Sequence, residues 1–263
     1  MTAPSLDYQN PPVIEVVCGV SFTPLERFQA IHVGMFWEHL KADFPGVEEH
    51  PPIGTVIERF PGPTPPTAEI QYVETPPLPR VWFLDKSGNE IIQVQRDVFL
   101  LNWRKLAPTD EYPRFRIVMG NFRNHLERFR TFVEEQSLGS ITPIQYELTY
   151  VNHVVEGPLW SQGKSVGELF PDFVWRKPSE RFMPFLPNYE AANWRTTFRL
   201  PEESGRLHVS IQTAFRRTNI NEPLVVFEMK ARGIGMDRSL DALPSWFNIA
   251  HEWIVRGFAD LTS

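Results

Sequence analysis

Charged and amide side chains alternate along two segments that we predict to be strands. In Glu90–Arg104, period-two alternation places the glutamines and Asp97 on one face and the arginines and Asn102 on the other. A similar alternation runs through the last predicted strand, Pro223–Arg232. Arginines hold anions, and carboxylates or a histidine exchange protons. The candidate binding residues are therefore Arg96, Asp97, Asn102, Arg104, Glu228, Lys230, Arg232 and, beside the apolar stripe of the last helix, His251.

These residues support more than one interpretation. A sheet covered on one face by helices leaves the other face open, and such a face is either solvated or a recognition surface. Alternatively, Arg96, Asp97 and Arg104 form an enzyme site for a phosphate-bearing substrate, with His251 or Glu15 completing it. That alternative requires the side chains to converge.

A second candidate interface is the arginine-rich stretch 114–133, which we predict to be helical. Basic residues interleaved with aromatic ones could follow a nucleic-acid backbone, although a charged solvent face of an amphipathic helix gives the same pattern. The net charge of −6 provides no basic field over the whole chain.

Several common chemistries lack their signatures. The seven histidines show no i,i+4 pair and there is one cysteine, Cys18, so we predict no metal site, no cofactor and no internal disulfide. Gly163–Gly167 matches the spacing of a serine nucleophile motif but does not follow a convincing strand. We therefore predict no catalytic residues. The sequence shows no signal peptide and no long apolar run, so we expect a soluble, cytoplasmic protein.

The order of predicted elements defines the expected architecture. Val13–Phe22 is a strand rich in β-branched residues, followed by a helix that we expect to begin near Thr23-Pro24 and to end before Pro45-Gly46. Short strands are predicted at 55–60 and 68–73, then a hairpin from Arg80 to Arg104, and then a long helix from Phe115. In the rest of the chain we predict a short helix at 166–170, a final helix at 243–261, and strands at 144–154, 194–200, 206–217 and 223–232.

This pattern predicts an α+β fold of two related halves, 1–139 and 140–263, within a single compact unit. Each half has the order strand, helix, antiparallel strands, long helix. Together they would form one curved antiparallel sheet covered on one face by the long helices.

Several motifs resemble an uncharacterised, sporadically distributed prokaryotic family of about this length. They are Pro11-Pro12-Val13-Ile14-Glu15-Val16, the segment Gln93–Asp97 with Asn102–Lys105, Tyr112–Phe115, Tyr150–Asn152, and Ala250-His251-Glu252 with Phe258. The resemblance carries no known activity, and its patchy distribution suggests a mobile-element or phage-defence setting.

The sequence thus favours a non-enzymatic recognition protein that binds a partner protein or a small ligand through the open sheet face. The alternative hypotheses are an enzyme that acts on a phosphate-bearing substrate and a protein that binds nucleic acid through the arginine-rich stretch.

Overall fold

The computed structural model describes residues 8–54, 56–60, 78–155, 166–173, 180, 182–183, 185–186, 191–216 and 219–262. The predicted strand at 68–73 and most of the Gly163–Gly167 motif lie outside this part of the chain.

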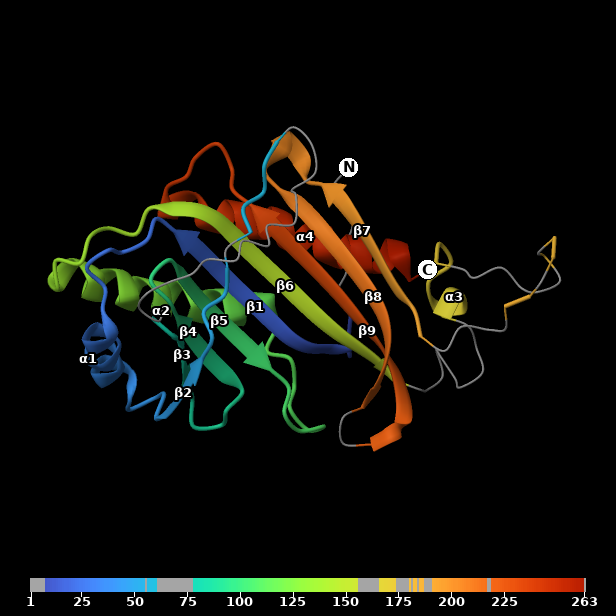
Figure 1. Cartoon of the computed structure of the whole chain (residues 1–263), viewed down its shortest axis with the longest axis horizontal. Helices are drawn as coiled ribbons and strands as arrows, with labels where there is room; N and C mark the ends of the chain where they lie inside the picture. Colours follow the sequence, from blue (N-terminus) through green and yellow to red (C-terminus); the bar gives the residue numbers. More distant parts are fainter. Residues whose placement is uncertain are drawn as a thin grey trace.

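One open antiparallel sheet dominates the fold (Figure 1). Within the described residues it has nine strands in the order β2-β3-β4-β5-β1-β6-β9-β8-β7. The strands are β1 (Val13–Phe22), β2 (Gly46–His50), β3 (Arg80–Leu84), β4 (Glu90–Val94), β5 (Val98–Arg104), β6 (Pro143–Val155), β7 (Asn193–Arg199), β8 (Arg206–Arg216) and β9 (Asn219–Gly233). The helices are α1 (Ala30–Leu40), α2 (Phe115–Glu135), α3 (Val166–Leu169) and α4 (Leu243–Leu261), with 3₁₀ turns η2 (Pro201–Glu203) and η3 (Leu240–Ala242). The α+β class with an antiparallel sheet is confirmed.

Strand β1 lies in the middle of the sheet, paired with β5 on one side and β6 on the other. Its even-numbered side chains, from Val16 to Phe22, are buried at no more than 1% exposure. An apolar strand with β-branched residues on both faces suits this central place, because both of its edges and one of its faces are covered.

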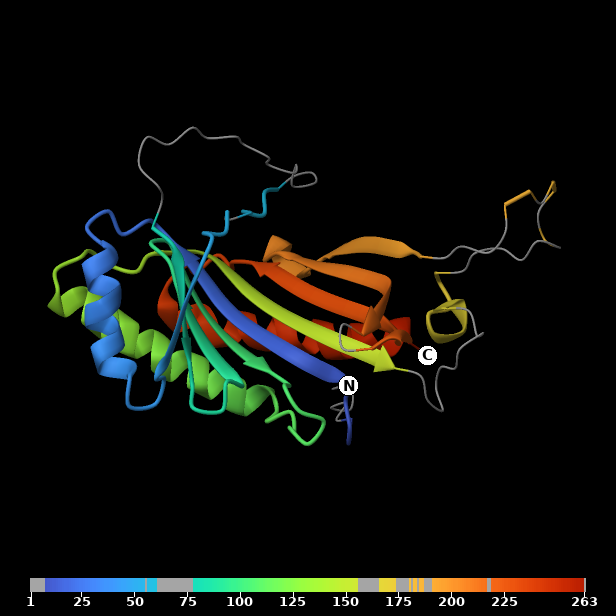
Figure 2. The ribbon, with the colours of Figure 1, turned by 60° about the horizontal axis from the view of Figure 1, so that its bottom comes forward.

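Helices α2 and α4 run along the same side of the sheet (Figure 2). Each presents an apolar stripe, in which Phe122 and Phe129 of α2 and Phe247 of α4 are fully buried. Phe129 contacts rings from β5 and α1, with centroids 5.3 Å from Phe99 and 5.1 Å from Phe36. Much of the aromatic excess of the sequence therefore fills this layer between helices and sheet.

The prediction of one strand over Glu90–Arg104 is wrong. Strands β4 and β5 form a hairpin, and Gln95, Arg96 and Asp97 make the connection between them. The turn reverses the chain, so Gln93 and Asn102 lie on the same face, where the Gln93 amide donates to Asn102 Oδ1 at 2.7 Å. The segment lacks the glycine or proline that normally marks such a turn.

The first helix begins later than expected, at Ala30. The backbone N–H of Gln29 donates to His32 Nδ1 at 2.9 Å, which closes a capping box at that point. Residues 56–60 form no strand; they are extended and cross the face of the sheet opposite α2 and α4 (Figure 2).

Candidate functional site

The sheet face opposite the two long helices is not simply open. Residues 51–54 and 56–60, which we call the strap, are tied to it through two glutamine side chains. Gln95 accepts from Ile53 N and donates to Ile53 O, at 2.9 and 3.0 Å. The Gln145 side chain likewise donates to Val56 O at 2.8 Å and accepts from Glu58 N at 2.9 Å.

Glu58 fixes the strap over the second half of the sheet. Its side chain is 2% exposed, and its two oxygens lie 2.6 Å from Arg206, 2.7 Å from His208 and 3.4 Å from Arg232. A buried carboxylate is retained only when its charge is paired and hydrogen-bonded, as it is here. Arg232, predicted to bind a ligand, is therefore part of an internal ion cluster.

The structure divides the other predicted binding residues among three locations. Asn102, Arg104, Glu228 and Lys230 share the sheet face with the strap. Asn102 donates to Glu15 at 2.6 Å, the Arg104 side chain donates to Gly88 O at 3.0 Å, and Lys230 lies 3.5 Å from Glu228. These contacts are those of a structural polar face.

Arg96 and Asp97 lie at the β4–β5 turn, the opposite end of β5 from Arg104. Arg96 donates to the carboxylate of Glu26 at 2.9 Å, and Asp97 accepts from Gln95 at 2.7 Å. His251 lies on α4, on the other side of the sheet. The convergence that the enzyme alternative requires is not found among these side chains.

Partners also occupy most of the basic side chains of the 114–133 stretch. Arg130 is paired with Glu127 and Glu134 of the same helix, and Arg128 donates to His39 O. Arg116 and Arg123 are exposed. The geometry gives nucleic-acid binding no particular support.

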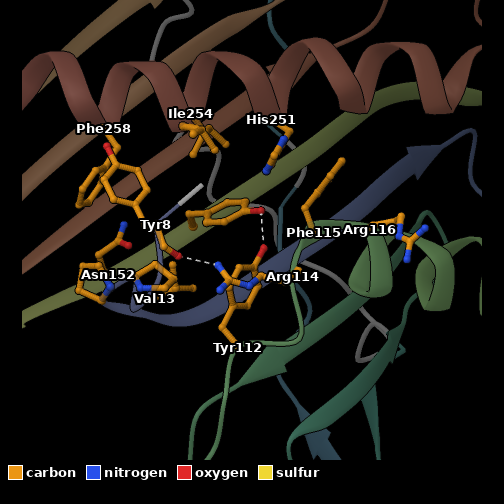
Figure 3. Close-up of a pocket in the computed structure, with 14 residues that line it drawn as sticks. Tyr8, Val13, Tyr112, Arg114, Phe115, Arg116, Asn152, His251, Ile254 and Phe258 are labelled. Atoms are coloured by element: carbon orange, nitrogen blue, oxygen red, sulfur yellow. Dashed lines mark hydrogen bonds between the residues drawn. The ribbon is translucent and has the colours of Figure 1, made fainter. Parts of the chain in front are cut away.

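A pocket between the first turn of α2 and the middle of α4 is the strongest candidate site (Figure 3). Its cavity volume is about 310 Å³, at the lower end of the range typical of small-molecule sites. Its floor is the start of β1 and the middle of β6. Its lining residues are Tyr8, Pro11, Pro12, Val13, Tyr112, Arg114, Phe115, Arg116, Tyr150, Asn152, His251, Ile254, Val255 and Phe258.

His251 is placed by its stack on Phe115, with ring centroids 4.0 Å apart and planes 9° apart. Burial lowers the pKa of His251 from 6.5 to about 4, so the imidazole is neutral near pH 7. Within the described chain, no hydrogen bond to either ring nitrogen is found. The sequence pointed to this histidine because it interrupts the apolar stripe of α4.

Two tyrosines face each other across the pocket wall. The hydroxyl groups of Tyr112 and Tyr150 are 2.7 Å apart, and Tyr150 is 4% exposed. Desolvation raises the pKa of both phenols well above its usual value, so both hydroxyls stay protonated. The residues are far apart in sequence, and only the resemblance drew attention to them.

Arg114 closes the pocket on the side of the N-terminal segment. It caps α2 with a φ of 75°, an uncommon conformation for a residue with a side chain. Its guanidinium donates to the backbone carbonyls of Tyr8 and Gln9, at 2.7 and 3.3 Å. Tyr8 in turn meets the ring of Phe258 edge-on at 5.4 Å. The strained cap therefore positions the segment that forms the pocket's rim.

Within the described part of the chain, no three His, Cys, Asp or Glu residues are grouped so as to hold a metal ion. The helices seen there are all too short or too polar to cross a membrane.

Against known proteins, the chain matches no protein-family model, and no curated protein is significantly similar to it.

Proposed function

We propose that this protein is a non-enzymatic recognition protein that binds a small, largely apolar molecule in the pocket between α2 and α4. The observation that carries the proposal is a lining of six rings around about 310 Å³ in which the His251 ring has no hydrogen-bond partner among the described residues. An apolar cavity with a few convergent polar groups is the usual form of a ligand site.

The hypothesis that the opposite sheet face binds a partner protein has less support. On that face the strap already contacts Gln95, Gln145, Arg206 and Arg232. A ligand on that face would have to displace a buried ion cluster, whereas a ligand in the pocket displaces none.

Binding of the neutral fluorescent two-ring probe 2-naphthol tests the pocket. Val255 lines it and is only partly buried, so Val255→Phe fills the space with little damage to the core. We expect this variant to weaken binding about tenfold. Val33→Phe on α1, which is also partly buried but lies outside the pocket, should retain the affinity. Equal binding by both variants would overturn the proposal.

We also infer that residues 1–139 and 140–263 are copies of one module, as the sequence pattern suggests. The mirrored strand order supports this inference. The neighbours of β1 going outward are β5, β4 and β3, and those of β6 are β9, β8 and β7. The test is superposition of Val13–Glu135 on Pro143–Leu261, which must bring β1 onto β6 and α2 onto α4. Membership of the sporadic prokaryotic family, and its phage-defence setting, are proposals of the same kind that rest on the motifs alone.

A further inference from the structure

The tyrosine pair in the pocket leaves one hydroxyl proton without an acceptor. Each phenol carries one O–H, and the 2.7 Å contact between Tyr112 and Tyr150 uses a single proton, whichever residue donates. Among the described residues, neither hydroxyl has a further partner. An unsatisfied donor in a largely buried site is costly, and Tyr150 is 4% exposed, so this proton indicates an acceptor that enters through the pocket.

The charges around the pocket define what kind of acceptor it prefers. Its lining contains Arg114 and Arg116 and no Asp or Glu, although the chain as a whole carries a net charge of −6. The His251 ring is neutral near pH 7 and so adds no charge. The field in the cavity is therefore positive, which favours an anion and opposes a cation.

The volume of the cavity and its aromatic lining indicate the size and chemistry of the rest of the ligand. A cavity of about 150 Å³ holds one benzene ring, so the volume of about 310 Å³ accommodates a body of about two rings. The aromatic side chains of Phe115 and Phe258 line it, and His251 adds a neutral N–H and a lone pair.

We propose that the ligand is an aromatic monocarboxylate of about two rings, whose carboxylate accepts a hydrogen bond from the Tyr112–Tyr150 pair within the positive field of Arg114 and Arg116. This assignment rests on the proposed function, since it names the chemistry of the molecule that the same pocket binds.

A pair of matched probes tests the charge. Naphthalene-2-acetate and naphthalene-2-acetamide have the same shape and differ in charge, and calorimetry at pH 7.5 in low salt measures both affinities. We expect the carboxylate to bind about tenfold more tightly, because hydrogen bonds to charged acceptors are the stronger ones. Replacing both tyrosines with phenylalanine (Tyr112→Phe with Tyr150→Phe) removes both hydroxyls and retains both rings. This double variant should lose most of the preference, whereas either single variant keeps one O–H free to donate.

Arginine variants separate the field of the pocket from the general charge of α2. Arg116→Gln should weaken the carboxylate about threefold and leave the amide unchanged. Arg123→Gln, a matched change on the same helix outside the pocket, should alter neither affinity.

The outcomes distinguish this inference from the proposed function. Equal affinity for carboxylate and amide, or an unchanged preference in the double Tyr112→Phe, Tyr150→Phe variant, would refute the anionic assignment while the pocket stands. The anionic assignment also fails, and the pocket stands, if neither naphthalene-2-acetate nor naphthalene-2-acetamide binds while 2-naphthol binding still responds to Val255→Phe. If Val255→Phe affects none of the probes, both proposals fail.

Discussion

Protonation of His251 should couple the stability of this protein to pH. Its pKa in the folded chain is about 4, against 6.5 for an ordinary histidine, because burial against Phe115 and α4 disfavours the charged ring. The unfolded chain therefore takes up this proton at a higher pH than the folded chain does. Stability is retained above about 6.5 and falls as the pH drops towards 4.

The magnitude follows from the separation of the two pKa values. One pKa unit corresponds to about 1.36 kcal/mol, so lowering the pH from 7.5 to 5 should remove about 2 kcal/mol of unfolding free energy through this residue alone. His251→Phe keeps a ring on Phe115 and removes the titrating group.

Urea denaturation of both proteins at pH 7.5 and pH 5 measures the effect. The wild type should lose about 2 kcal/mol more than His251→Phe over this interval, because the other titrating groups cancel in the comparison. Equal losses in the two proteins would show that the imidazole is not desolvated in the folded state, and would remove the neutral histidine from the pocket chemistry.

Three further predictions concern the scaffold. Glu58→Gln should cost about 3 kcal/mol of unfolding free energy because it leaves buried cations unpaired. Glu203→Gln, at an exposed ion pair, should cost less than about 0.5 kcal/mol. Similar losses in the two variants would mean that the strap is not held by charge. Gly205→Ala should destabilise the protein by about 3 kcal/mol or more, since a Cβ there would lie 2.2 Å from a backbone oxygen of β9. Gly120→Ala, in open space on α2, should instead stabilise it by about 1 kcal/mol. Thermal and urea unfolding measure both changes, and a tolerated alanine at position 205 would contradict the packing described. Cys18 is fully buried with a raised pKa, so its thiol should react with a disulfide reagent only after denaturation, and rapid reaction of the native protein would contradict its position in the core.

Sequence patterning predicted the elements whose burial alternates regularly. The bounds of β1 were correct because its run of β-branched and apolar residues is bordered by proline at one end and Thr23-Pro24 at the other. The long helices were likewise visible as apolar stripes. The same Thr23-Pro24 pair misled the placement of α1, since a capping pattern there leads into a turn and the helix is capped by Gln29 and His32 instead.

Contacts between distant segments could not be read from local patterns. The strap has no periodic pattern of apolar residues. Its attachment depends on Gln95, in the β4–β5 turn, and on Gln145, on β6. The pocket combines Tyr112 before α2, Tyr150 on β6 and His251 on α4, and only the last stood out by its position in a stripe. Residues that gather in space without a shared spacing leave no signal in a single sequence.

The central position of β1 has a consequence for how the chain is made. Cys18 pairs with Leu101 on one side and Leu148 on the other, so β1 is synthesised well before either of the strands that pair with it. Contacts of such long sequence separation slow folding, and an apolar strand with two open edges invites aggregation in the interval. During synthesis, β1 is therefore a segment that we expect a chaperone to protect until β5 and β6 have emerged.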